Sequence, residues 1–283
     1  MIAYFKRQSN LFMVAGALLG LIFTGLAYDN MMRPQPVLLR AFLMLIPVLL
    51  GIILGRIIAS RWATVRMQKI TSLLYRDGDP AAFLAEFEPI SRNVPASTAE
   101  YYDAQVKLAF AYEALGRFDE GLERLENLKP ETLKLHGLSS RAAICNQQAR
   151  LLLLKEDIEQ AKVVIDELRE LQEAASHRAP TLGKQLSNCI ELFDIWLRVI
   201  EDQPTDAGYL QDEINLANNR IHKSEMELLL ASARHNEGSD EAANELLRAA
   251  ADTGKGLYTG EKADKLLNHY NDYSYISRIP SEN

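Results

Sequence analysis

The side chains that could bind a metal or attack a substrate are scattered singly along this chain. None of its five histidines belongs to an HExxH motif or pairs with a cysteine at a metal-ligand spacing, although metal sites are built from such clusters. The two cysteines, Cys145 and Cys189, lie far apart without CxxC spacing, which is not the pattern of a disulfide framework. We expect both to be small core residues, and we predict no metal site.

A glycine-rich segment, TGKGLYTGEK (253–262), is the nearest approach to a phosphate-binding loop. It lacks the GxxxxGK[ST] spacing and follows a helical pattern where such loops follow a strand. Its glycines are typical of a helix stop. Carboxylates are abundant, but they lie between apolar positions at helical spacing, which is the usual place of a solvated face. We therefore predict no catalytic residue and no cofactor.

The charge of the chain is divided between its two ends. The net charge is −7 in total, with +4 over residues 1–60 and +2 over residues 61–79, which leaves −13 for residues 80–283. Binding of nucleic acid needs a clustered basic surface. An acidic body of this size excludes nucleic acid as the expected partner and favours partners that are basic.

Two apolar segments predict a pair of transmembrane helices within residues 1–60. Residues 11–28 carry no charge, and residues 36–59 form a second apolar stretch. A helix of roughly 20 residues crosses the ~30 Å hydrocarbon core of a bilayer, so the protein is expected to contact lipid through both segments. A cleaved signal peptide is the alternative for the first segment, because Lys6 and Arg7 resemble the basic start of such a peptide.

Basic residues predict the orientation of this hairpin. One side of the two spans carries only Arg33 and the nearby Arg40, whereas the other side carries Lys6, Arg7, Arg56, Arg61, Arg66 and Lys69. By the positive-inside rule, both termini lie in the cytoplasm together with the acidic body. We therefore expect a multi-pass protein of the cell membrane with two spans.

Each predicted span contains a GxxxG motif. The first pairs Gly16 with Gly20, and the second pairs Gly51 with Gly55. Small residues at this spacing let two helices approach closely. The stripes would pair the two spans with each other, or with a second copy of the chain in a homodimer. The alternative is a chance match, since glycine is common in membrane helices.

The rest of the chain is predicted to be helical. Residues 61–97 are expected to form a juxtamembrane helical linker, in which Asp79 is a natural N-cap and Pro80 suits the first helical position. From about residue 98 the apolar residues recur at helical spacing without alternating β-branched runs, so the fold class is all-α. Residues 98–283 form the second domain, with a capping helix near residues 259–270.

This domain repeats its own pattern of small and apolar residues. A shift of 40 residues places Gly121 on Ala161, and a shift of 122 residues places Gly116 on Gly238. Small residues recur where the two helices of a hairpin touch, and large apolar residues recur where the next hairpin stacks. One helix pair cannot bury its apolar face alone, so the repetition predicts an α-solenoid of about three to four helix pairs.

The repeated pattern resembles the tetratricopeptide repeat. That family has a small residue, an aromatic, a turn glycine, a second aromatic and a second small residue at fixed steps, and LAFAYEALGRFDEGLERLENL (108–128) matches them. QARLLLLKEDIEQAKVVIDEL (148–168) and LASARHNEGSDEAANELLRAA (230–250) match more loosely, with Glu156 in place of the turn glycine in the former. Residues 181–219 resemble one further, diverged hairpin. The resemblance covers roughly residues 98–252.

The resemblance implies a peptide-binding groove lined by the first helix of each hairpin. The positions carried over are Asp103, Phe110 and Glu113 from the first copy, Asn146 and Arg150 from the second, and Ser232 and His235 from the third. Phe110 would anchor an apolar side chain of the ligand, or would instead pack against a neighbouring helix or residues 80–88. Arg150 would pair with a carboxylate or carbonyl of the ligand, or would be a solvated charge.

These features predict a membrane-anchored cytoplasmic scaffold for protein interactions. A membrane anchor raises the local concentration of a bound protein or peptide partner near the bilayer. The alternative is an accessory or assembly subunit of a membrane transporter or secretion complex, with the solenoid as a support. A membrane-bound enzyme with an unrecognised site is a third alternative, which no motif recommends.

Overall fold

The computed structural model describes residues 2–27, 37–130 and 137–268. Within these ranges the chain is helical and contains no strand, which confirms the predicted all-α class. The elements are η1 (Ile2–Phe5), α1 (Lys6–Ala27), α2 (Val37–Tyr75), α3 (Pro80–Ser91), α4 (Ala99–Ala114), α5 (Phe118–Leu125), α6 (Gly137–Lys155), α7 (Ile158–Arg178), α8 (Pro180–Ile200), α9 (Ala207–Leu216), α10 (Arg220–Asn236), α11 (Asp240–Thr253) and α12 (Tyr258–Asn268).

The chain divides into two compact units. The first comprises residues 1–71 and 89–95, and the second comprises residues 72–88 and 96–283. Helices α1 and α2 are each long and apolar enough to cross a membrane. Helix α2 does not end with the predicted span at residue 59 but continues to Tyr75, because no glycine or proline interrupts residues 56–75.

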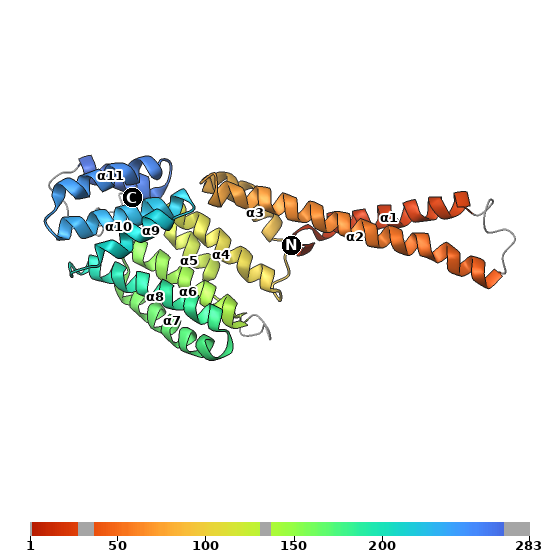
Figure 1. Ribbon diagram of the computed structural model, residues 1–283, viewed down its shortest axis with the longest axis horizontal. Coiled ribbons are helices and arrows are strands. Elements are labelled where there is room, and N and C mark those ends of the chain that lie inside the picture. The colour runs from red at the N-terminus through yellow and green to blue at the C-terminus, as the bar shows by residue number, and fades with distance from the viewer. Residues whose placement is uncertain (1, 28–36, 131–136, 269–283) are drawn as a thin grey trace. The chain divides into compact units, whose positions relative to one another are not determined.

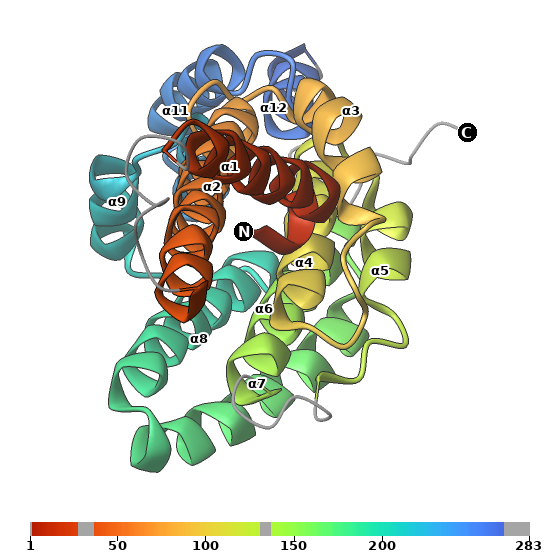
Figure 2. The same ribbon diagram turned by 90° about the vertical axis from the view of Figure 1, so that its right-hand side faces the viewer.

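In the second unit, helices that follow one another in the sequence pack as pairs. Contacts join α4 to α5, α6 to α7 and α10 to α11, and further contacts join α4 to α6 and α6 to α8 (Figure 1). Figure 2 shows the same neighbourhood of α6, α7 and α8 from a second direction. Helix α9 contacts α10, so the two helices of the diverged segment 181–219 do not form a pair like the other three.

The turn inside each of these three pairs has the same backbone conformation. Gly116, Glu156 and Gly238 all have a positive φ, of 71°, 71° and 76°. In the first turn the Gly116 amide donates to the Glu113 carbonyl and the Arg117 amide donates to the Tyr112 carbonyl. The other two turns have the equivalent pair of hydrogen bonds, and this pattern is a Schellman motif. These are the positions that the shifts of 40 and 122 residues superpose, so the sequence repeat corresponds to a repeat of local structure.

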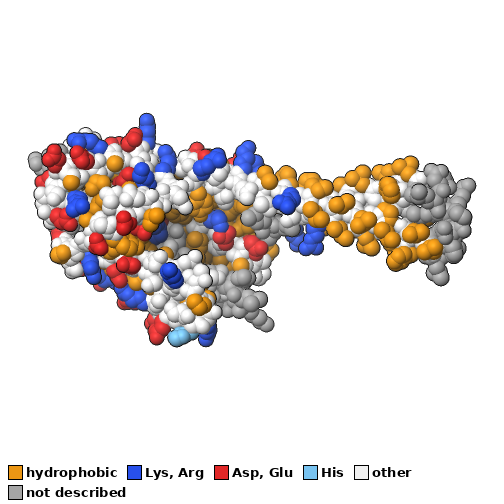
Figure 3. Space-filling model, viewed as in Figure 1, with side chains coloured by type: hydrophobic (Ala, Val, Ile, Leu, Met, Phe, Trp, Pro, Cys, Tyr) orange, Lys and Arg blue, Asp and Glu red, His pale blue; other side chains and the backbone are white. Residues whose placement is uncertain are grey.

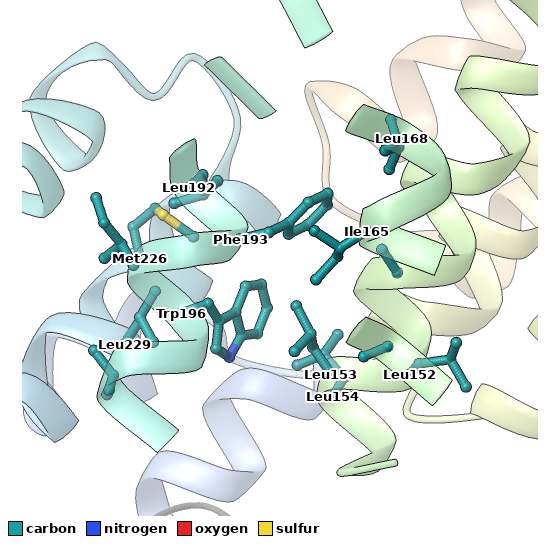
Figure 4. Packing of buried hydrophobic residues seen from close by; sticks show 14 of the residues in the cluster. Leu152, Leu153, Leu154, Ile165, Leu168, Leu192, Phe193, Trp196, Met226 and Leu229 are labelled. Atoms are coloured by element: carbon teal, nitrogen blue, oxygen red, sulfur yellow. The ribbon is translucent and has the colours of Figure 1, made fainter. Parts of the chain in front are cut away.

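The core of the second unit is built where the pairs stack. Phe193 and Trp196 of α8 lie between Ile165 of α7 and Met226 of α10, as Figure 4 shows, and all four side chains are almost fully buried. Burial of a large apolar side chain stabilises a fold by about 1.5–3 kcal/mol. Ala161 and Ala243, which take the place of Gly121 in the other pairs, are fully buried.

The two ends of this unit contain the remaining predicted features. Asp79 accepts a hydrogen bond from the Ala82 amide at 2.9 Å, as expected of an N-cap for α3. Helix α12 begins at Tyr258, and its apolar side chains pack with α10 and α11, in agreement with the predicted capping helix. Residues 269–283 lie outside the described residues.

Candidate functional site

The residues predicted to line a groove lie on α4, α6 and α10, but they do not share one environment. Asp103 is exposed, and four others are half-buried, namely Phe110, Asn146, Ser232 and His235. Glu113 and Arg150 are buried, with 2% and 9% of their surface exposed. The prediction that these two side chains face a ligand is therefore wrong, because they face each other inside the protein.

Arg150 joins three helices through one guanidinium group. Its Nη2 donates to Glu113 Oε1 of α4 at 2.8 Å and to Glu225 Oε2 of α10 at 2.6 Å. Gln147, one turn before Arg150 on α6, donates from Nε2 to the other carboxylate oxygen of Glu113. Charge-assisted hydrogen bonds of this kind are roughly twice as strong as neutral ones. The cluster therefore ties α4, α6 and α10 together at a buried point.

A second layer of charged groups surrounds Glu225. His222 Nδ1 lies 3.7 Å from Glu225 Oε2, and His222 Nε2 lies 3.3 Å from Glu213 Oε2 of α9. The other oxygen of Glu225, Oε1, is buried and accepts no hydrogen bond within the described part of the chain. Three carboxylates thus share one guanidinium and one imidazole, so the cluster has no spare positive charge to offer an anionic ligand.

The electrostatics of the two carboxylates that share Arg150 are not equivalent. Burial raises the pKa of Glu113, and the attraction of Arg150 offsets only part of this effect. Burial acts in the same direction on Glu225, but there Arg150 and His222 together outweigh it and lower the pKa of the carboxyl. Burial alone would lower the pKa of His222, yet Glu225 and Glu213 raise it. Glu113 is therefore the carboxyl of this pair that protonates first on acidification.

Phe110 packs against another aromatic ring. Its ring stacks on Tyr75, at the end of α2, with a centroid separation of 5.7 Å and an interplanar angle of 16°. Arg150 Cζ also lies 5.8 Å from the Phe110 centroid, within the range of a cation–π contact. Of the two alternatives that the sequence left open, the structure shows packing against a neighbouring helix.

The remaining predicted groove residues make local contacts. Asp103 forms an ion pair with Lys107 one turn along α4. Ser232 donates to the Leu228 carbonyl at 3.1 Å, and His235 Nδ1 lies 2.7 Å from Asp240 Oδ1 of α11. Asp103 is exposed and Asn146, Ser232 and His235 are half-buried, so these four side chains reach the surface, unlike Glu113 and Arg150.

Sequence reasoning missed Gln147, His222 and Glu225. The available signal was weak: Glu225 and Glu227 stand on either side of Met226, directly before the apolar run LLLA (228–231) of α10, and both prove to be buried. Acidic residues are common elsewhere on exposed helix faces of this chain, so their type alone did not mark them. Only the arrangement of α4, α6 and α10 places Glu225 on Arg150.

The two glycine stripes bring the backbones of α1 and α2 into contact. A Cβ atom added to Gly16 would lie 2.1 Å from the Gly51 carbonyl oxygen, and one added to Gly51 would lie 2.1 Å from that of Gly16. The corresponding distances are 2.4 Å from Gly20 to the Pro47 oxygen and 2.4 Å from Gly55 to the Phe12 oxygen. Within this chain, the stripes pair the two apolar helices with each other.

Thr24 continues the first stripe by one turn. Its hydroxyl Oγ1 lies 2.8 Å from the Gly20 carbonyl of its own helix and 3.3 Å from the Met44 carbonyl of α2. Side-chain hydroxyls that reach a neighbouring helix add a directional contact where apolar packing is not selective.

Comparison of the chain with protein-family models, with curated proteins and with solved structures finds no match. Its function is therefore inferred from its own residues.

Proposed function

We propose that this protein is a membrane-anchored scaffold, in which the α1–α2 hairpin inserts in the bilayer and the paired helices of the second unit bind a protein partner. The observation that carries the proposal is the distribution of exposed apolar side chains. Leu11, Leu19, Phe23 and Leu26 of α1 are 64–72% exposed, and hydrophobic side chains cover the visible face of α1 and α2 (Figure 3).

Exposure of this kind is costly in water and favourable in lipid. Along α2, large apolar residues are exposed from Leu39 to Val65, whereas on α3–α12 only Val163 and Leu216 are exposed large hydrophobics within the described residues. Contiguous apolar patches mark an interaction with another protein or a membrane. The length of both helices and the contact between their glycine stripes favour the membrane, because tight backbone packing is how helices associate in lipid.

The repeated turns support a tetratricopeptide-like second unit. Three helix pairs use the same Schellman turn at superposable positions, and small residues are buried where their helices meet. Stacked helix pairs of this type present extended surfaces made of equivalent positions on successive helices. Asp103 of α4 and Asn146 of α6 lie on the first helices of two successive pairs, although not at equivalent positions. The acidic character of residues 80–283 favours a partner with a basic surface.

Co-purification of the full-length protein after extraction in mild detergent tests the scaffold function. We expect a soluble, basic protein to accompany the wild type. The double variant Asp103→Lys/Asn146→Lys should retain at least about tenfold less of that protein, which corresponds to about 1.4 kcal/mol of binding free energy.

The matched control makes the same change in net charge on α7, which is the second helix of its pair and not part of the proposed binding surface. Val163 and Glu173 are exposed on α7, so Val163→Lys/Glu173→Lys should retain the partner at the wild-type level. Equal retention by both double variants would contradict a binding surface on the first helices. Recovery of only integral membrane proteins at fixed stoichiometry would instead support the accessory-subunit alternative.

A separate experiment tests the proposed orientation, in which both termini and the second unit are cytoplasmic. In intact cells, a cysteine introduced at Asn30 should react with a membrane-impermeant thiol reagent. A cysteine at Val163, which is 69% exposed on α7, should react only after the membrane is permeabilised. Labelling of position 163 in intact cells, with position 30 protected, would reverse the orientation.

A further inference from the structure

A cavity of about 420 Å³ lies where the turns of the first two helix pairs meet α12. Its walls come from the start of α5, from the α6–α7 turn and from α12. Two of the lining residues, Phe118 and Tyr258, form a T-shaped aromatic contact with ring centroids 4.8 Å apart. The proposed binding surface for a protein partner does not include this cavity. It is large enough to admit a small molecule.

Lys262 of α12 lies on the cavity wall with little exposure to water. Its side chain is 5% exposed, and Nζ donates to Tyr258 Oη at 2.9 Å and to Glu156 Oε1 at 3.3 Å. The same ammonium lies 5.3 Å from the centroid of the Tyr258 ring. A lysine is rarely buried to this extent, so the arrangement holds an amine at the edge of an open volume.

Glu156 holds this amine from a backbone position that suits glycine. Its φ is 71°, and the equivalent positions in the first and third helix pairs are Gly116 and Gly238. A side chain in the left-handed region costs free energy that glycine does not. The α6–α7 turn therefore carries an unfavourable residue type at position 156. The carboxylate of this residue contacts Lys262.

The protonation state of Lys262 differs from that of an ordinary lysine. Burial lowers its pKa to about 8, and Lys265 acts in the same direction, while Glu156 opposes them. At pH 8 about half of the Lys262 amines are then neutral, compared with roughly 0.4% for a lysine with the usual pKa. Only the neutral amine is a nucleophile. The other titratable and charged side chains that line the cavity are Arg117, Asp119, Glu120, Lys155, Tyr258 and Glu261.

We propose that Lys262 is an acylation site, modified by small acyl phosphates that enter the cavity beside α12. The Nζ lone pair attacks the acyl carbon, the bond from that carbon to the phosphate oxygen breaks, and phosphate leaves with the electron pair. The amine loses a proton to water or to Glu156, and an amide remains. Lys265, which forms no ion pair within the described residues, lines the cavity where the anionic phosphate can lie.

Acylation would also change the structure around the site. It removes the charge on Lys262 and with it the ion pair to Glu156, whose side chain is only 24% exposed. This ion pair connects the α6–α7 turn to α12, so the modification would weaken the attachment of the last described helix.

Competitive acetylation of the full-length protein tests the proposal. The protein in detergent is treated with limiting acetyl phosphate between pH 6 and pH 10, and the modified peptides are quantified by mass spectrometry. Lys162 is the internal control, because its side chain is 44% exposed and a hydrogen bond to Glu201 raises its pKa. We expect Lys262 to react at least about tenfold faster than Lys162 at pH 8, with a midpoint near pH 8.

The variant Glu156→Gly tests whether the reactivity of Lys262 depends on the pKa of its amine and not only on the access of acetyl phosphate to the cavity. Glycine suits the backbone at this position, and loss of the carboxylate should move the midpoint of Lys262 below the wild-type value, since Glu156 raises the pKa of Lys262. The proposal is overturned if Lys262 reacts no faster than Lys162 at pH 8, or if it reacts only after denaturation.

Discussion

Replacement of Arg150 with methionine is expected to lower the free energy of unfolding by about 3–5 kcal/mol. The change removes the guanidinium that donates to both Glu113 and Glu225, whose side chains are 2% and 3% exposed. Two carboxylates would then remain buried close to each other without their shared cation. The measurement is urea unfolding of the full-length protein in detergent, followed by circular dichroism.

Two further variants test whether the loss of stability comes from the buried position of the cluster. Arg169→Met removes an arginine that also contacts two carboxylates, Asp166 and Asp194, but its side chain is 45% exposed. Because surface ion pairs contribute about 0–1 kcal/mol, this variant should unfold almost as the wild type does. The triple variant Glu113→Gln/Arg150→Met/Glu225→Gln should recover most of the lost stability, since no charge is left unpaired. A loss below about 1 kcal/mol for Arg150→Met would mean that water solvates the cluster.

Replacement of Gly16 with leucine is expected to force α1 and α2 apart. The nearest obstacle to a Cβ atom is the Gly51 carbonyl at 2.1 Å, and a backbone group cannot rotate aside as a side chain can. The separation between the helix axes depends on the side chains at the contact. We expect an increase of about 2 Å or more, measured by electron paramagnetic resonance between spin labels at exposed Leu18 and Leu54 after Cys145 and Cys189 are replaced with alanine.

Gly25 provides the matched control on the same helix. A Cβ atom at this position would meet no heavy atom within 4 Å, so Gly25→Leu should leave the label distance unchanged. If Gly16→Leu and Gly25→Leu give the same distance as the parent protein, the glycine stripes do not set the packing of the two apolar helices.

Local sequence patterns determined the class of fold and the positions of its main elements. Helical periodicity arises within a few turns of one helix, so the all-α class did not depend on knowing which helices are neighbours. The length of an apolar segment is likewise a local property, and it identified α1 and α2. The turn positions at residues 116, 156 and 238 were found by shifts of the sequence alone, because the same local backbone requirement recurs in each pair.

The sequence could not decide which polar residues on the first helices are buried. Arg150 is 37 residues from Glu113 and 75 residues from Glu225, and each of these residues taken singly is typical of a solvated helix face. Their burial depends on how closely α4, α6 and α10 approach, which is a property of packing between helices. The same reason applies to Phe110, whose contact with Tyr75 requires the end of α2 to reach α4.

The Lys262 site illustrates the same division. Sequence comparison between the copies located Glu156 at a turn position that glycine occupies elsewhere, because that requirement is set by the backbone of a single turn. It did not show that a lysine 106 residues away lies against this carboxylate. Tertiary structure alone brings α12 over the α6–α7 turn, and the burial that results lowers the pKa of the amine, because desolvation acts only once distant segments exclude water together.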